Sequence, residues 1–198
     1  MDLAGEAREL ARKLLGGGFS HGYPHVERVM RYASVISSEA EKFDRTLLEV
    51  SVYLHDVGRP LGEPHAYYSS LIARGFLGGR GCDGKFVELV VNAVEYHSYS
   101  YVQLRRIEPL SVEAKILSDA DKLDALGIVG VLRAFEHGIR SGRSLTETLA
   151  HFDEKLLRVK DLLHFDVSRR LAEELEDRLR RAATWMREEL GLPREEGL

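Results

Sequence analysis

Histidine and aspartate side chains stand at the ends of several predicted helices, where they could hold a metal ion together. His25 opens one helix, the adjacent pair His55 and Asp56 closes the next, and Asp121 lies on a later one. Burying an unpaired carboxylate is costly, so buried acids are normally paired or bound to metal. Imidazole and carboxylate together suit Mn²⁺, Fe²⁺, Zn²⁺, Co²⁺ or Ni²⁺. We interpret these four residues as candidate ligands of a divalent ion.

Helical periodicity turns each of these side chains toward the interior, because each continues an apolar stripe at helical spacing. In chain order, the stripes contain His25, Val29, Tyr32, Ala33 and Ile36; Leu48, Val52, His55 and Asp56; Val90, Val94 and His97; and Ala114, Leu117 and Asp121. Any one of them alone would be read more simply as a satisfied core histidine or as a polar helix end. Their occurrence together, on separate helices, favours a shared metal site.

Capping and turn residues divide the chain into helices joined by short loops. The helices are predicted at about 3–15, 24–43, 45–56, 64–77, 84–97, 112–121, 127–138, 145–164 and 166–190, with residues 98–109 irregular. Strand-like alternation is scarce. The predicted fold class is therefore all-α, a single helical bundle with the metal site in its core.

Composition limits the class of protein further. The 198 residues are 44% hydrophobic and 30% charged, which suits one folded domain. A net charge of −4 gives no basic footprint for duplex nucleic acid. The single cysteine excludes a disulfide within the chain, and neither a signal peptide nor an apolar run of membrane-spanning length is visible. We expect a cytoplasmic protein without a membrane partner, with a homo-oligomer left open.

The order of the candidate ligands resembles the H…HD…D signature of the HD superfamily of metal-dependent phosphohydrolases. His25 occurs in HVERV, His55 and Asp56 in LHDVGR, and Asp121 in SDADKLDALG. The resemblance covers most of the chain. It implies one HD domain over residues 1–198, with a core at about 20–130 and C-terminal helices at about 144–190 packed on it. It also implies hydrolysis at phosphorus in a small phosphorylated substrate, with one or two ions of Mn, Mg, Fe, Co, Ni or Zn.

The later segment HFDEKLL, followed by Lys160 and Asp161, is similar to bacterial HD-domain nucleotide pyrophosphohydrolases. This branch implies cleavage of a nucleoside triphosphate to a monophosphate and pyrophosphate, and a substrate contact at Lys155. Three alternatives remain open at this point. They are a nucleotidase or phosphodiesterase on another phosphate ester, a dinuclear-iron oxygenase, and a nucleotide sensor without catalysis.

Other polar residues near the signature are assigned to supporting roles. His65 and His97 stand where some HD enzymes hold a second metal, so they are candidates for that ion or for substrate. Cations suited to bind phosphate or stabilise charge on it are Arg59, Lys122 and Arg28. Acidic residues expected to orient the ligands are Asp119, Asp124 and Glu63.

Overall fold

The computed structural model describes residues 2–154 and 156–193. Within these ranges the chain contains α-helices and short 3-10 helices and no strand, which confirms the all-α prediction. The chain divides into two compact units, Met1–Asp121 and Lys122–Leu198. The prediction of a single domain over the whole chain stays a prediction.

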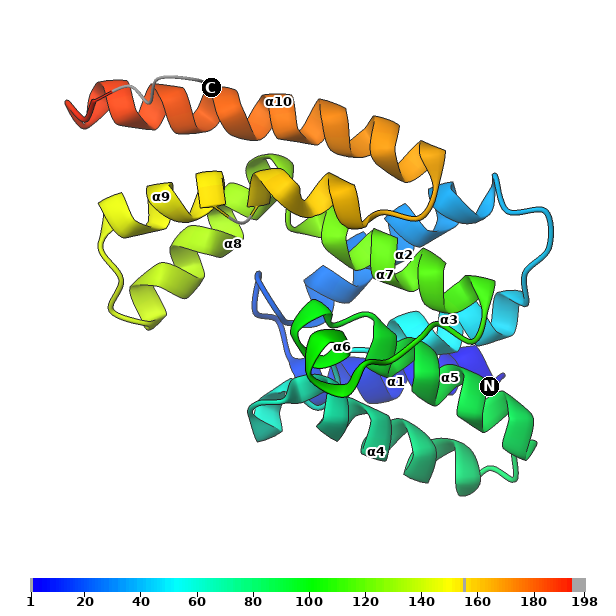
Figure 1. The fold of residues 1–198 in the computed structure, drawn as a ribbon. Helices are drawn as coiled ribbons and strands as arrows, with labels where there is room; N and C mark the ends of the chain where they lie inside the picture. The colour runs from blue at the N-terminus through cyan, green and yellow to red at the C-terminus, as the bar shows by residue number, and fades with distance from the viewer. Residues whose placement is uncertain (1, 155, 194–198) are drawn as a thin grey trace. The chain divides into compact units, whose positions relative to one another are not determined.

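The first unit is built around one short central helix. Its elements are α1 (Leu3–Leu15), α2 (Tyr23–Ser37), α3 (Arg45–Leu54), η1 (Arg59–Leu61), α4 (His65–Gly78), α5 (Gly84–Tyr96), α6 (Tyr99–Arg105) and the greater part of α7 (Val112–Asp124). Helix α3 contacts α1, α2, α4 and α5, and α4 packs along α5 (Figure 1). A residue at the end of α3 therefore lies among several other helices.

Local sequence explains why α3 begins where it does and why it is buried. The Asp44 side chain accepts a hydrogen bond from the amide of Leu47, which caps the helix as predicted. Val50, Val52 and Leu54 are fully buried. Because α3 has neighbours on several sides, it is apolar around most of its surface, and the polar pair at its end enters the same interior.

Two predicted boundaries in this unit were wrong. The helix predicted to reach residue 43 ends at Ser37, where the hydroxyls of Ser37 and Ser38 bond back to the carbonyls of Ser34 and Val35. Such local bonds compete with continuation of the helix. The segment predicted to be irregular contains α6, which buries Tyr101 and ends at Arg106 in a left-handed conformation. A helix this short depends on tertiary burial rather than on periodicity.

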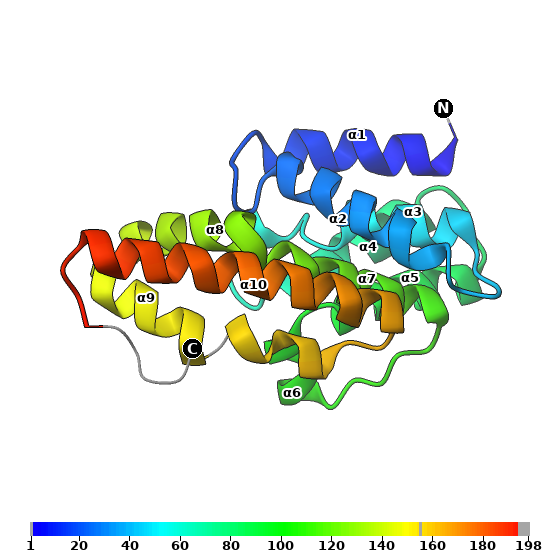
Figure 2. The same ribbon diagram turned by 90° about the horizontal axis from the view of Figure 1, so that it is seen from above.

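The second unit packs three helices around a small apolar core. Its elements are α8 (Gly127–Arg140), α9 (Leu145–Glu154), η2 (Leu156–Leu162) and α10 (Asp166–Glu189). Helix α8 lies alongside α10 (Figure 2), and the core contains Val131, Leu149, Leu179 and Ala183. The helix predicted over 145–164 was wrong in its extent, because the chain has α9 and then η2 on the two sides of Lys155.

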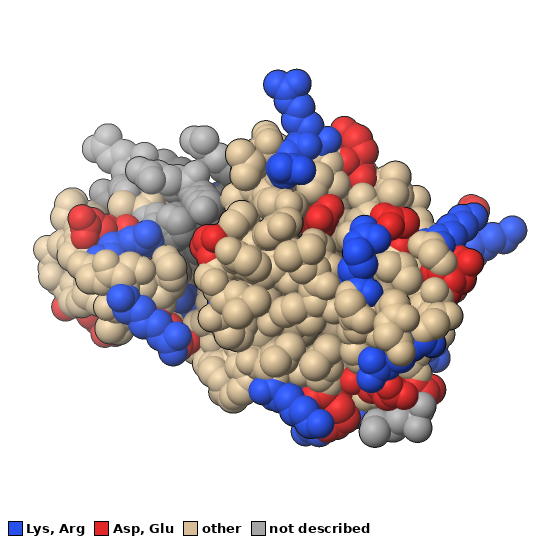
Figure 3. All heavy atoms as spheres, turned by 90° about the horizontal axis from the view of Figure 1, so that it is seen from below, with Lys and Arg blue, Asp and Glu red and all other residues tan. Residues whose placement is uncertain are grey.

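A capping box of Ser144 and Glu147 starts α9, at the helix start that the sequence predicted. The amide of Glu147 donates to the Ser144 hydroxyl, and the amide of Ser144 donates to the Glu147 carboxylate. On the face shown in Figure 3, basic and acidic side chains are scattered among wide uncharged areas, and neither sign forms a continuous patch. None of the described helices combines the length and the hydropathy needed to span a membrane.

Candidate metal centre

The candidate centre begins at the turn that ends α3. His55 is the C-cap of this helix, and Asp56 follows it in the turn that leads to η1. Gly58 then passes directly against α4, with its amide donating to the Ser69 hydroxyl at 2.9 Å. A Cβ on Gly58 would lie 2.2 Å from the backbone nitrogen of Ser69. Only glycine allows this approach, which fixes the turn against the helix that carries His65.

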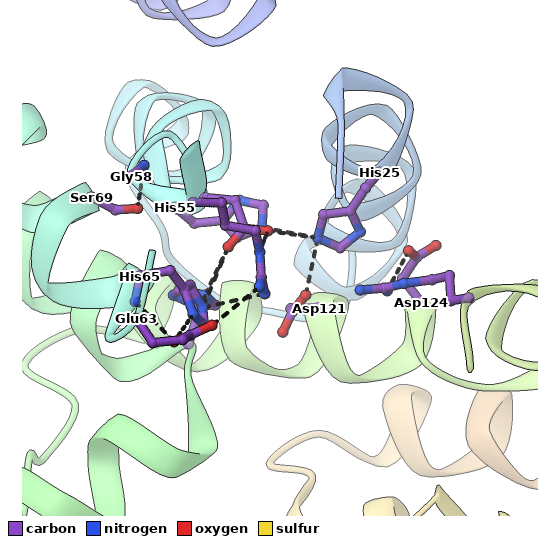
Figure 4. Close-up of polar contacts among 12 residues, drawn as sticks. His25, His55, Gly58, Glu63, His65, Ser69, Asp121 and Asp124 are labelled. Carbon is purple, nitrogen blue, oxygen red and sulfur yellow. Dashed lines mark hydrogen bonds and ion pairs between the residues drawn. The ribbon is translucent and has the colours of Figure 1, made fainter. Parts of the chain in front are cut away.

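The four predicted ligands come together in the structure. His25 Nε2 lies 3.1 Å from His55 Nε2, 3.6 Å from Asp56 Oδ2 and 3.3 Å from Asp121 Oδ1. His25, His55 and Asp56 are fully buried, and the Asp121 side chain is 23% exposed. Figure 4 shows His25, His55 and Asp121 arriving from different parts of the chain and turning toward one another. We name His25, His55, Asp56 and Asp121 the first cluster.

A second cluster shares Asp56 with the first. Asp56 Oδ1 lies 3.5 Å from His65 Nε2 and 3.5 Å from His97 Nε2, and these two nitrogens are 3.3 Å apart. Both histidines are buried. Asp56, His65 and His97 have the spacing of a metal-ligand group, as do His25, His55 and Asp56. One carboxylate thus stands between two possible ion positions.

Hydrogen bonds made by the far side of each ring assign the histidine tautomers. Nδ1 of His55 lies 2.7 Å from the carbonyl oxygen of Val52, and Nδ1 of His97 lies 2.5 Å from that of Val94. Nδ1 of His65 lies 3.0 Å from Glu63 Oε2. Oxygens of these kinds only accept, so each Nδ1 carries the proton. In the neutral ring, Nε2 then presents a lone pair toward Asp56, as in a histidine that binds metal.

The charge distribution in the two clusters favours binding of a cation. Burial lowers the pKa of His55 to about 3, and burial also lowers the pKa of His65. Burial opposes ionisation of Asp56, yet the Arg59 guanidinium holds the pKa of its carboxyl well below the usual value. The neutral rings of His55 and His65 therefore turn Nε2 lone pairs toward an ionised carboxylate. Its Oδ1 is buried without a hydrogen-bond partner among the described residues.

A divalent ion fits this arrangement of donors. In the second cluster, acceptors that face one another at 3.3–3.5 Å repel unless something positive lies between them. The only ligand atoms offered are nitrogen and oxygen, which suit the borderline and hard divalent ions and exclude selection by thiolate. His25, His55, Asp56 and Asp121 would hold one ion, and Asp56, His65 and His97 a second.

Arg59 is a cation in direct contact with both clusters. Its Nε donates to Asp56 Oδ2 at 2.5 Å, and its Nη2 lies 3.3 Å from His65 Nε2. Glu63 Oε1 lies 3.8 Å from Nη1 of the same guanidinium. The Arg59 side chain is 23% exposed, so it reaches from the buried carboxylate toward solvent. Among the cations predicted to bind phosphate, Arg59 contacts candidate metal ligands directly, namely Asp56 and His65.

The other predicted cations have different surroundings or none that can be described. Arg28 is buried, donates to the carbonyl of Phe19 at 3.0 Å and stacks over that ring. Lys122 is partly buried and begins the second unit. Lys155 lies outside the described residues. The roles of these three residues in binding phosphate stay predictions.

The acidic residues predicted to orient the ligands differ in what they contact. Glu63 accepts from both the backbone amide and Nδ1 of His65, so it supports one member of the second cluster. Asp124 is buried and pairs with Arg133 at 2.7 Å within the second unit. Asp119 is buried on α7, where its charge adds to burial in raising the pKa of Tyr96. For Asp119 and Asp124, support of the ligands stays a prediction.

Sequence reasoning missed three contributions to the site. The carbonyls of Val52 and Val94 set two histidine tautomers, although a histidine at the C-terminal end of a helix has such carbonyls within reach by geometry alone. The close approach of Gly58 to Ser69 had no signal in the local sequence. The pairing of Arg59 with Asp56 was also missed, although the i, i+3 spacing of the two residues allows it.

The chain is similar to known proteins in sequence and in fold. The HD domain model matches residues 22–126. The uncharacterised protein YpgQ of Bacillus subtilis is 35% identical over 167 residues, which cover 78% of this chain and 77% of YpgQ. The structure of YpgQ in complex with ADP covers 94% of each chain with a TM-score of 0.76 and 27% identity. The structure of an HD-superfamily hydrolase from Bacillus thuringiensis covers 93% of this chain and 95% of that one, with a TM-score of 0.70 and 26% identity.

The matched segment of the family model contains the turn at His55 and Asp56 together with His25, His65, His97 and Asp121. With the buried histidine–aspartate clusters, this match suggests a divalent metal site. The similarity to HD-superfamily hydrolases suggests a metal-dependent hydrolase. The chain therefore belongs to the HD domain family.

Proposed function

We propose that this protein is a metal-dependent phosphohydrolase of a small phosphorylated substrate, and that the substrate is a nucleotide. The observation that carries the proposal is the convergence of buried imidazoles and a buried carboxylate, with Asp56 shared by two ligand groups. The reaction we assign is the hydrolysis of a nucleoside triphosphate to a monophosphate and pyrophosphate. The HFDEKLL segment supports this finer choice by resemblance.

The side chains divide the work of such a reaction. A bound divalent ion would supply Lewis acidity toward a phosphoryl oxygen and a bound water of lowered pKa. His25, His55, Asp56 and Asp121 hold the ion position, and the carbonyl of Val52 fixes the ring of His55. Arg59 is permanently charged and partly exposed, so it can form paired hydrogen bonds with phosphate oxygens at the edge of the cluster.

The nucleotide part of the proposal rests on a relative. The structure of YpgQ in complex with ADP shows that a protein with this fold accepts a nucleoside diphosphate. The exposed part of Arg59 and the partly exposed Asp121 mark the side from which a phosphate would approach the first cluster. This is consistent with a charged substrate whose phosphates meet the ligands while its base stays outside.

A product-resolved assay tests the proposal. The protein is stripped with EDTA, reloaded separately with Mn²⁺, Mg²⁺, Co²⁺, Ni²⁺, Zn²⁺ or Fe²⁺, and incubated with nucleoside mono-, di- and triphosphates. Release of pyrophosphate from a triphosphate supports the proposed reaction, whereas release of orthophosphate from a monophosphate indicates a nucleotidase. His55→Ala should abolish release, and Asp177→Asn, on the exposed side of α10, should not. Nucleotide binding without release under any ion contradicts the proposal, as does oxygen consumption by the iron-loaded protein.

A further inference from the structure

The Arg59 guanidinium lies against ligand atoms of both clusters at once. It contacts Asp56 Oδ2, which belongs to the first cluster, and His65 Nε2, which belongs to the second. Since Nδ1 of His65 is bonded to Glu63, Nε2 is the only nitrogen that this ring can offer to an ion. The resident positive charge therefore uses lone pairs that a metal ion would need.

The two clusters are affected unequally by this contact. In the first cluster, His25, His55 and Asp121 make contacts with one another that do not involve Arg59. In the second cluster, Arg59 takes the lone pair of His65, and only His97 and Asp56 Oδ1 are left to an ion. A permanent cation beside that position also repels an incoming ion. Arg59 also contacts Asp56 Oδ2, but the first position keeps three ligands that Arg59 does not contact, whereas the second keeps one histidine.

Arg59 has an alternative arrangement within reach. Its side chain is 23% exposed, and Glu63, which is 71% exposed, lies 3.8 Å from Nη1. A tetrahedral phosphate offers the guanidinium two acceptor oxygens in a geometry that matches its fork. A phosphorylated ligand at the edge of the cluster can therefore draw Arg59 away from His65 and Asp56.

We propose that Arg59 gates the second ion position: it covers His65 and Asp56 in the absence of phosphate, and a phosphorylated ligand releases it so that a second ion binds. This inference rests on the proposed function, because it takes the phosphate group as the ligand. The number of metal ions bound then depends on whether a phosphorylated molecule is present. By linkage, the second ion must tighten phosphate binding by the same factor by which phosphate tightens the second ion.

Metal counting tests the gate without an activity assay. EDTA-treated protein is titrated with Mn²⁺ by equilibrium dialysis, with and without inorganic phosphate, and electron paramagnetic resonance distinguishes single Mn²⁺ ions from coupled pairs. In wild type we expect one ion without phosphate, and a second ion that phosphate tightens by about tenfold or more, within the usual range for coupled sites. Arg59→Gln should bind both ions without phosphate, and phosphate should then change the second step by less than about twofold.

Two comparison variants sharpen the result. Arg74→Gln removes an arginine that pairs with Glu88 on the exposed side of α4, and it should behave as wild type. His97→Ala should abolish the second ion in every background and leave the first. If Arg59→Gln is poorly folded, the phosphate dependence of the wild-type isotherm decides alone. The gate is overturned if wild type binds two ions without phosphate, or if phosphate leaves the second step unchanged.

The outcomes separate the gate from the proposed function. Phosphate or pyrophosphate release by a protein whose Mn²⁺ isotherm is the same in wild type and Arg59→Gln overturns the gate alone. A phosphate-dependent second ion without turnover of any nucleotide supports the gate and overturns the hydrolase. A protein that binds no Mn²⁺ in any variant overturns both.

Discussion

Asp56→Asn is the substitution whose effect the structure predicts most sharply. Asp56 contacts members of both clusters, through Oδ2 to His25 and through Oδ1 to His65 and His97. Replacing one carboxylate oxygen by an amide group removes the charge from both ion positions while keeping the shape of the side chain. We expect the variant to lose the stabilisation that a metal ion gives.

The size of the effect follows from mass action. An ion at about 100 times its dissociation constant stabilises a native state by about 2.7 kcal/mol. For a chain of this length that corresponds to a rise in Tm of about 5–11 °C. Wild type should show a shift of this size between EDTA and saturating Mn²⁺, and Asp56→Asn should show almost none.

The same substitution should leave the metal-free protein nearly as stable as wild type. The new amide can donate to a lone pair of His65 or His97, both 3.5 Å from Oδ1. It loses the ion pair with Arg59, but that side chain is 23% exposed and has Glu63 beside it. We therefore expect a net change within about 1.5 kcal/mol, the size of one hydrogen bond.

Differential scanning fluorimetry of the EDTA-treated and Mn²⁺-loaded proteins measures both effects. Asp177→Asn is the matched control, because Asp177 also pairs with an arginine, Arg181, but on an exposed stretch of α10. This control should keep the full metal-dependent shift. The reasoning is refuted if Asp56→Asn gains as much from Mn²⁺ as wild type does.

Three further predictions concern the surroundings of the clusters. Because burial lowers the pKa of His55 to about 3, against about 6.5 in an unfolded chain, the unfolded state takes up a proton that the native state does not. The free energy of unfolding of the metal-free protein, measured by urea titration, should therefore fall by about 2 kcal/mol between pH 6.5 and pH 5. If the free energy of unfolding of His55→Gln depends on pH as steeply as that of wild type, the prediction is contradicted. Glu63→Ala removes the acceptor for Nδ1 of His65 and should weaken binding of the second ion about 10–100-fold in Mn²⁺ dialysis with phosphate present, with no change in the first ion. Gly58→Ala should cost about 1–3 kcal/mol in the same urea titrations because its Cβ meets the backbone of Ser69, whereas Gly75→Ala, where the added methyl meets nothing within 4 Å, should be neutral or stabilising.

Capping residues and apolar stripes were sufficient to predict most helix starts and the faces that they bury. Asp44, Asp83, Ser111 and Ser144 all accept hydrogen bonds from the first turns of their helices, because a cap acts within three residues of sequence. The end of α2 and the existence of α6 were not predicted. The end of α2 depends on serine hydroxyls that bond to backbone carbonyls, and α6 depends on tertiary burial. Hydrophobic periodicity carries no information about either.

The convergence of the site could be predicted because each ligand continues a buried stripe. The only further assumption was that the helices share one interior. This was sufficient to bring together His25, His55, Asp56 and Asp121. Asp124 shows where this reasoning stops, since its partner Arg133 lies nine residues away on the next helix and no pattern marks the pair. The Arg59 contacts likewise depend on the turn geometry that Gly58 permits.

Anomalous X-ray diffraction from crystals grown with Mn²⁺ tests the central claim most directly. The account predicts a manganese peak within ligand-bond distance of Nε2 of His25 and His55 and of a carboxylate oxygen of Asp56, close to the roughly 2.0–2.2 Å that zinc shows with such ligands. A peak elsewhere, or clusters that bind only water at millimolar Mn²⁺ with their Nε2 atoms protonated, would contradict it.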